Sequence, residues 1–391
     1  MTRKIDLERL HGLMERDNLD VLIASSPENV FYISDLPTTF TSSNRLFYSI
    51  ASTTPTFCVI PKGEEPKLII TNSAAETARK HSLIKDQRTY ATGVYIVREK
   101  KAAIQDYRKG SLEALTTMLD ETRPIEKIGV EQRSIQLALF NHLKGSFADA
   151  ALVGADSVFD EMRMVKTEEE IKRFAMATKI ACKAILKVVD SVEAGISELE
   201  LDKILKTAIL DEGGDSWHQT TIAVGAENGP DIFNQPSQKK VTQGDIIRID
   251  IGPTYKGYTA DISRVVVFDK LPEKARRLYK ILMQAEEKAI EAIKPGVTTS
   301  YVHKIGQEYV RDRYDTKYTR GNIGHGVGIS LWEPPILREK NPIELAVDMT
   351  MSVEIPYHKF GLGGFNIEDS VIVTKNDHEI ISDISREIFI V

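Results

Sequence analysis

The sequence predicts an α+β protein of two domains, an N-terminal α/β domain at residues 1–157 and a larger C-terminal domain at residues 158–391. Three observations support this prediction. A chain of 391 residues is long enough to bury two cores. Helical and strand patterns alternate through the first part, which is typical of an α/β domain. The second part groups long helical patterns around alternating strand patterns, which indicates an antiparallel sheet.

The N-terminal domain is predicted from short segments taken in order. A helical pattern at residues 7–16 precedes the apolar run LDVLIAS at 19–25, which is typical of a buried strand. A turn is expected at 26–29, strands at 57–60 and 67–71, and helices at 74–80 and 112–119. No catalytic constellation is visible in this part, so the function is expected to lie in the second domain.

The C-terminal domain opens with a helix start signal. In the run TEEE, Thr167 and Glu170 form a predicted capping box, and Ser197 with Glu200 repeats the pattern. A strand is expected at 220–224, helices at about 272–294 and 300–313, and further strands in the tail after residue 349.

The amino-acid composition and the net charge exclude several classes of protein. Apolar residues make up 42% and charged residues 28%, which is ordinary for a soluble globular chain. The net charge of −6 argues against a nucleic-acid partner, whose binding surface would be basic. Two cysteines give no disulfide framework, and no apolar run in the sequence is long enough to span a membrane. The charged, helical pattern at residues 1–20 lacks an apolar core, so we expect no signal peptide. We therefore expect a cytoplasmic protein without membrane contact.

The stretch at residues 244–268 is the most informative. Isoleucines alternate with Arg248 and Asp250, a period of two that is typical of a strand. Glycine and proline then mark a turn, and the following run ends in three valines. If the two runs pair as a hairpin about residues 255–256, Asp250 and Asp261 lie roughly opposite each other on one face.

Two carboxylates placed in this way repel each other. Either both aspartates lie at the turn ends and face water, or a divalent cation lies between them. A hard cation takes several oxygen ligands, so the second reading requires further ligands elsewhere in the chain.

Three further candidates follow. His325 lies among glycines in the run GHGVG, and imidazole is a common metal ligand. Glu354 and Glu368 lie on two late strand-like runs. Taken singly, the histidine is more often a loop residue and each glutamate more often faces solvent. Together with the hairpin they form an Asp, Asp, His, Glu, Glu set: Asp250, Asp261, His325, Glu354 and Glu368.

This set, in this order and local context, resembles the creatinase/aminopeptidase P/methionine aminopeptidase superfamily, the pita-bread metallohydrolases, and its Xaa-Pro dipeptidases most. The hairpin signature D-x-G-x-x-x-x-x-Y-x-x-D-x-x-R is matched from Asp250 to Arg264, and the G-H-G-x-G signature at 324–328. Segments 19–35 and 163–171 resemble the family's N-terminal domain and domain junction. The resemblance implies a C-terminal pita-bread fold behind a creatinase-like N-terminal domain.

The resemblance also implies a cofactor and a site. Two divalent metal ions (Mn, Co, Fe or Zn) would be bridged by Asp261 and Glu368. Asp250 would complete one ion's site, and His325 with Glu354 the other. A metal-bridging hydroxide would attack a carbonyl carbon while Glu354 handles protons. The expected substrate is an Xaa-Pro dipeptide or an N-terminal Xaa-Pro bond, and the expected assembly is a homodimer.

Three positions depart from the family pattern. Asn234 and Trp332 stand where the proline-specific members have histidines, and Asn366 stands where they have an arginine. We expect Asn234 to supply a hydrogen-bond donor and Trp332 an apolar wall with one N–H. His218 and His358 are candidates to replace the missing histidines.

These departures leave three functions open. The intact ligand set favours a metallopeptidase of the Xaa-Pro dipeptidase type. The altered positions would also suit a same-fold enzyme that acts on a small non-peptide substrate by C–N hydrolysis, as creatinase or ectoine hydrolase does, or by a lyase reaction. A non-catalytic binding module is the third reading, and the complete ligand set argues against it.

Overall fold

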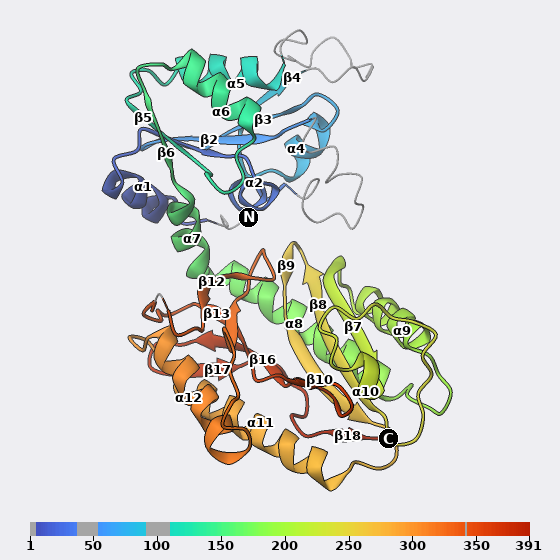
Figure 1. The fold of residues 1–391 in the computed structure, drawn as a ribbon. Coiled ribbons are helices and arrows are strands. Elements are labelled where there is room, and N and C mark those ends of the chain that lie inside the picture. Colours follow the sequence, from blue (N-terminus) through green and yellow to red (C-terminus); the bar gives the residue numbers. More distant parts are fainter. Residues whose placement is uncertain (1–4, 37–53, 91–109, 341) are drawn as a thin grey trace. The chain divides into compact units, whose positions relative to one another are not determined.

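The computed structural model describes residues 5–36, 54–90, 110–340 and 342–391 (Figure 1). The chain divides into two compact units, Met1–Met162 and Arg163–Val391. Helix α7 (Asp156–Met164) contains both this division and the boundary expected between residues 157 and 158. Among the described residues, no helix is both long enough and apolar enough to cross a membrane.

The N-terminal unit is built on a six-stranded sheet in the order β4-β3-β2-β1-β5-β6, parallel except at the β1–β2 and β2–β3 pairs. Its strands are β1 (Val21–Ala24), β2 (Phe57–Pro61), β3 (Lys67–Thr71), β4 (Asp86–Tyr90), β5 (Lys127–Val130) and β6 (Ala151–Gly154). Its helices besides α7 are α1 (Leu7–Arg16), α2 (Pro27–Ser34), α4 (Ala75–His81), α5 (Ser111–Asp120) and α6 (Leu137–Ser146).

One prediction in this unit is wrong. The segment expected to be a turn at 26–29 begins helix α2, in which Ser26 is the N-cap and accepts from the backbone N–H of Asn29. Pro27 occupies the first turn, where its missing N–H costs nothing. The same Ser-Pro pair that suggested a turn is therefore a helix start.

The C-terminal unit is built on a ten-stranded sheet whose main path runs β12-β11-β13-β16-β10-β8-β7. Its strands are β7 (Ser216–Val224), β8 (Ile246–Tyr255), β9 (Tyr258–Thr259), β10 (Ile262–Val267), β11 (Gly324–Gly326), β12 (Glu333–Ile336), β13 (Thr350–Glu354), β16 (Glu368–Val373), β17 (His378–Ile380) and β18 (Phe389–Ile390). A separate hairpin joins β14 (Tyr357–Lys359) to β15 (Gly363–Phe365). The main path is antiparallel throughout, as the sequence predicts.

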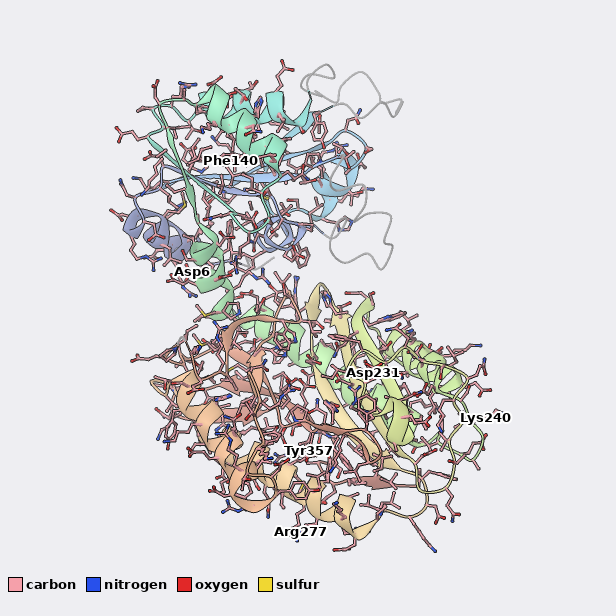
Figure 2. All side chains as sticks on the ribbon, viewed as in Figure 1. Asp6, Phe140, Asp231, Lys240, Arg277 and Tyr357 are labelled. Carbon is pink, nitrogen blue, oxygen red and sulfur yellow. The ribbon has the colours of Figure 1, made fainter. Side chains whose placement is uncertain are left out.

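Two pairs of helices pack on this sheet. One core cluster joins α8 (Glu168–Val189) and α9 (Glu198–Asp211) to β7, β8 and β10. Another joins α11 (Glu273–Glu291) and α12 (Thr299–Arg313) to β10, β13 and β16. The short helix α10 (Gly225–Asn228) follows β7. Side chains fill the space between the helices and the sheet (Figure 2). Both predicted capping boxes are present, at the starts of α8 and α9.

The alternation along β8 decides which side chains meet the helices. Ile247, Ile249 and Ile251 belong to the cluster with α8 and α9. Because successive side chains of a strand point to opposite faces, Arg248 and Asp250 lie on the other face. The hydrophobic pattern that anchors the strand thus places the polar residues away from these helices.

The pairing of β8 with β10 is offset from the hairpin expected from the sequence. Asp250 pairs directly with Ser263, and Ile251 with Ile262. Extending this register places Asp261, just before β10, opposite Gly252. The two aspartates are therefore diagonal neighbours on one face, two residues from a direct pair. A Cβ on Gly252 would lie 2.7 Å from Leu331 Cδ1 and 3.0 Å from the carbonyl oxygen of Ala260, so a larger residue here would force its neighbours to move.

Candidate metal centre

The five predicted ligands lie on five adjacent strands or at their ends. The sheet order places β11, β13, β16, β10 and β8 side by side. These strands carry, in the same order, His325, Glu354, Glu368, Asp261 and Asp250. Glu354 and Glu368 are direct cross-strand partners. Residues up to 118 positions apart in the sequence are thus brought to one region of the sheet.

Three of these residues form a tight group. Among the described residues, ligand atoms of Asp261, His325 and Glu368 all lie within 4.8 Å of one another. His325 Nε2 is 3.6 Å from a carboxylate oxygen of Asp261. The other ring nitrogen, Nδ1, is 3.1 Å from the carbonyl oxygen of Gly326. Because a carbonyl only accepts, Nδ1 carries the proton, and Nε2 is left as a ligand atom.

Burial changes the protonation of the whole cluster. Burial and the neighbouring carboxylates Asp250 and Glu354 raise the pKa of Asp261 well above its usual range. Burial and the neighbouring Asp261 likewise raise the pKa of Glu368 well above its usual range. Burial also lowers the pKa of His325 to about 4, so the imidazole is neutral and able to bind a metal at pH 7.

The donor set fits divalent cations. Each of the four carboxylates has a pKa raised chiefly by burial. Crowding like charges in a buried site is unfavourable without counter-charge, and a cation between them supplies it. Carboxylate oxygens with one neutral imidazole suit several borderline and hard divalent ions.

Sequence reasoning missed two polar residues that orient the aspartates and Glu368. Gln219 on β7 donates from Nε2 to Asp250 at 2.7 Å and to Asp261 at 3.4 Å. The Ser352 hydroxyl is 2.9 Å from Glu368 Oε1 and 3.0 Å from the backbone oxygen of Asp261. The period of two could have indicated Ser352, which lies two residues before Glu354 on the same strand. Gln219 carries no such signal.

Two arginines pair with the outer carboxylates. Arg248 Nη1 is 3.1 Å from Asp250, and its side chain is 1% exposed. Its remaining bonds go to backbone oxygens, including those of Gly229 and Asp231. Arg320 Nη2 is 3.4 Å from Glu354 Oε1 and its side chain is 26% exposed. Arg248 is therefore held in place beside Asp250, while Arg320 keeps access to solvent.

The Asn234 amide has structural partners. Its Nδ2 donates to the backbone oxygen of Ile222 at 2.9 Å and lies 3.4 Å from Glu198 Oε1. Glu198 also accepts from the backbone of Val224 and the side chain of Asn228. In this arrangement a role as donor to a substrate requires the Asn234 amide to leave these partners.

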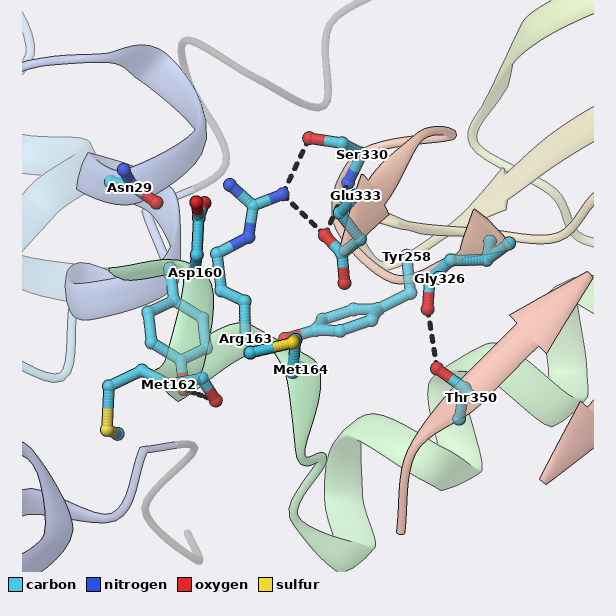
Figure 3. A network of polar contacts seen from close by, with 12 residues as sticks. Asn29, Asp160, Met162, Arg163, Met164, Tyr258, Gly326, Ser330, Glu333 and Thr350 are labelled. Atoms are coloured by element: carbon cyan, nitrogen blue, oxygen red, sulfur yellow. Dashed lines mark hydrogen bonds and ion pairs between the residues drawn. The ribbon is translucent and has the colours of Figure 1, made fainter. Parts of the chain in front are cut away.

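Trp332 lies directly on a predicted ligand. Its ring stacks on the His325 ring, with centroids 4.2 Å apart and planes at 28°, and the residue is 52% exposed. Its neighbour Glu333 is buried and forms ion pairs with Lys166 and with Arg163. The contact between Arg163 and Glu333 is drawn in Figure 3. These pairs hold the segment in place, so Trp332 can act as an apolar wall beside the imidazole.

The remaining candidates lie at different places. The Nδ2 of Asn366 is 3.3 Å from Glu354 Oε2, which places this departure beside a predicted ligand. His358 lies on β14. His218 lies on β7 where the pairing with β8 is irregular, between Trp217 and Gln219.

The cluster predicts a pH-dependent response to metal. A carboxyl group with a raised pKa keeps its proton in the folded state above the 3.8 or 4.5 at which the unfolded chain releases it. The metal-free fold is thus favoured at low pH, and this advantage is lost as the pH rises towards the folded pKa. A bound cation instead requires the carboxylates to be ionised.

We therefore expect the increase in melting temperature caused by Mn²⁺ to grow as the pH is raised from about 5 to about 8. Thermal unfolding of chelator-treated and Mn²⁺-loaded protein at each pH measures it. An increase that is the same at every pH would contradict the proposed ligand set.

The fold and this acidic cluster define a metallohydrolase with a separate N-terminal domain. Comparison with known protein families identifies the family to which the chain belongs. Residues 172–375 match the model of metallopeptidase family M24, and residues 7–165 match the creatinase/prolidase N-terminal domain. The first match covers more than half of the 391 residues, so the chain belongs to metallopeptidase family M24. The predicted resemblance and the predicted fold are thereby confirmed.

Individual relatives align with nearly the whole chain. A Xaa-Pro dipeptidase of Pyrococcus furiosus is 25% identical over 382 residues, covering 98% of this chain and 99% of the relative. The crystal structure of an X-Pro aminopeptidase from Thermotoga maritima superimposes with a TM-score of 0.82 at 26% identity, covering 99% of both chains. A Xaa-Pro dipeptidase structure from Bacillus anthracis shares the fold, with a TM-score of 0.83 at 23% identity and coverage of 98% and 99%.

Proposed function

We propose that this metallopeptidase hydrolyses Xaa-Pro dipeptides, with two divalent cations held by the acidic cluster. The observation that carries the proposal is the buried group of Asp261, His325 and Glu368, extended by Asp250 and Glu354 on the adjacent strands. The relatives named Xaa-Pro dipeptidase favour a peptide over a small non-peptide substrate. The expected homodimer and cytoplasmic location stay predictions.

The positions of the side chains suggest how the ligands divide. Asp261 and Glu368 lie centrally in the strand order and would contact both cations. Asp250 lies on one side of them and would complete one site. Glu354 and His325 lie on the other side and would complete the second site. Bonds from Gln219 and Ser352 orient the central carboxylates before any cation binds.

When bound, the cations would polarise the scissile carbonyl and lower the pKa of an attacking water. The chain's own groups supply the remaining steps. Glu354, whose pKa is raised by burial, would accept a proton from the water and return it to the proline nitrogen as the bond breaks. The proton on His325 Nδ1 is held by Gly326 and keeps the imidazole in one orientation. Trp332 would limit access of bulk water beside that imidazole.

A substrate panel tests the proposal. Metal-free protein is reconstituted separately with Mn, Co, Fe and Zn, and turnover is measured on Ala-Pro, Ala-Pro-Ala, Ala-Ala and creatine. We expect Ala-Pro to be cleaved with a kcat/KM at least about 100-fold above that for Ala-Ala, because only the first has the tertiary amide bond. Turnover of creatine, or no Ala-Pro cleavage with metal bound, would overturn the proposed function.

A further inference from the structure

The ring of Trp332 occupies an unusual place for a large apolar side chain. It lies on the predicted ligand His325, with ring centroids 4.2 Å apart and planes inclined by 28°. The tryptophan is 52% exposed, whereas the histidine that it covers is only 1% exposed. The indole thus gives one face to the imidazole and leaves about half of its surface in water. Burial of apolar surface therefore explains little of this placement.

Buried charges fix the segment that carries Trp332. The side chain of the next residue, Glu333, is 4% exposed and accepts from Lys166 Nζ at 2.8 Å and from Arg163 Nη2 at 2.5 Å. Arg163 also donates to the Ser330 hydroxyl at 2.6 Å, so it joins both ends of this short segment (Figure 3). Breaking a buried ion pair leaves a charge without compensation, so the backbone beside the indole is held in place.

The pairing of β11 with β12 brings the two rings together. Gly326 pairs with Glu333, and the register of the two strands shifts between His325 and Gly326. A Cβ on Gly326 would lie 2.3 Å from the carbonyl oxygen of Pro334, so the strands approach each other closely here. Irregular pairing of this kind commonly re-aims side chains beside a functional site. The imidazole is also fixed, because its Nδ1–H is held by the Gly326 carbonyl at 3.1 Å.

A bound cation would change the attraction between the two rings. Coordination through Nε2 withdraws electron density from the imidazole, so the whole ring gains partial positive charge. The face of an indole carries the negative part of its quadrupole and is the most attractive aromatic surface for a positive group. The stack is therefore stronger when His325 holds a cation than when it does not. By linkage, the stack must raise the affinity for that cation by the same factor.

We propose that Trp332 is a positioning residue of the metal centre, which acts through His325 to strengthen binding of the cation on that side. The effect is confined to one site, because the ligand that would complete the other site, Asp250, is a carboxylate and has no ring to stack on. The proposal gives a physical role to tryptophan at a position where the family resemblance implies histidine. It rests on the metal ions of the proposed function and not on its substrate.

Metal binding to a graded series of variants tests the proposal without turnover. Mn²⁺ is titrated into metal-free protein in competition with a chelator, which yields two dissociation constants. Trp332→Phe keeps a weaker aromatic face, and Trp332→Leu keeps apolar cover without such a face. We expect one dissociation constant to rise about 2- to 5-fold with phenylalanine and about 5- to 30-fold with leucine, the range of a cation–π contact. The other constant should not change.

A matched control separates this contact from the loss of an aromatic side chain in general. Tyr301→Leu removes an aromatic residue of α12 that is 51% exposed, and it should leave both dissociation constants at their wild-type values. Unchanged affinity in Trp332→Leu would overturn the proposal. Equal weakening by phenylalanine and leucine, or an equal loss at both cation sites, would overturn it as well.

Tryptophan emission provides a second measurement, which decides the matter if Trp332→Leu does not fold. The chain has two tryptophans, so Trp217→Phe leaves Trp332 as the only one. Its emission should change in proportion to the amount of Mn²⁺ bound, and constant emission would contradict contact between the indole and a metal-binding imidazole. A graded loss of metal affinity in a protein that cleaves no Xaa-Pro peptide would support the role of Trp332 and reject the proposed function.

Discussion

Replacing Asp261 with asparagine is expected to lower kcat/KM for an Xaa-Pro dipeptide by at least about 1,000-fold, which corresponds to about 4 kcal/mol. Asp261 lies at the centre of the ligand group, within 4.8 Å of atoms of His325 and Glu368. An amide of the same shape keeps the packing but removes the charge that a shared carboxylate would offer to both cations. The variant should also retain no more than one of the two proposed ions per chain.

Elemental analysis after removal of free metal, together with dipeptide kinetics, measures both effects. Asp211→Asn, an exposed aspartate at the end of α9, is the control and should keep the wild-type metal content and activity. A variant at Asp261 with two tightly held ions would show that this carboxylate is no shared ligand. Full activity with a reduced metal content would show that catalysis does not need both ions.

Replacing Glu354 with glutamine should lower kcat by roughly 100- to 10,000-fold, the range typical of a lost proton-transfer group. Burial raises the pKa of Glu354, while Arg320 opposes the rise, so the group is suited to gain and release a proton during turnover. Glutamine cannot accept a proton, but it still fills the position opposite Glu368. The amide should also weaken binding of the cation nearest His325.

Steady-state kinetics over a range of pH distinguish these two effects. With metal held at saturation, a remaining loss in kcat and a flattened acidic limb of the pH profile indicate the lost proton transfer. Recovery of wild-type kcat at high metal concentration would show that Glu354 acts only as a metal ligand and not in proton transfer. Glu379→Gln, an exposed glutamate on β17, is the matched control.

Much of the fold was predictable because local signals agree with the global arrangement. The alternation at Ile247, Ile249 and Ile251 places β8 on its helices, and the same alternation places Asp250 on the opposite face. The capping boxes at Thr167 and Ser197 mark two helix starts correctly. The turn expected at residues 26–29 failed because serine followed by proline is equally suited to begin a helix.

The polar environment of the candidate site was less predictable. Gln219 lies on a strand with no motif, and its contact with Asp250 depends on how β7 pairs with β8. Arg320 reaches Glu354 from a loop 34 residues away in sequence. The partners of Asn234 depend on the folding of the whole segment after β7. Such contacts arise from tertiary packing, which residue spacing does not encode.

Anomalous diffraction from crystals grown with Mn²⁺ tests the central claim most directly. The claim is that Asp250, Asp261, His325, Glu354 and Glu368 together hold two cations. Data collected at the manganese absorption edge should show two peaks per chain, both in contact with Asp261 and Glu368. A single peak, or peaks beside other residues, would contradict this assignment and with it the proposed mechanism.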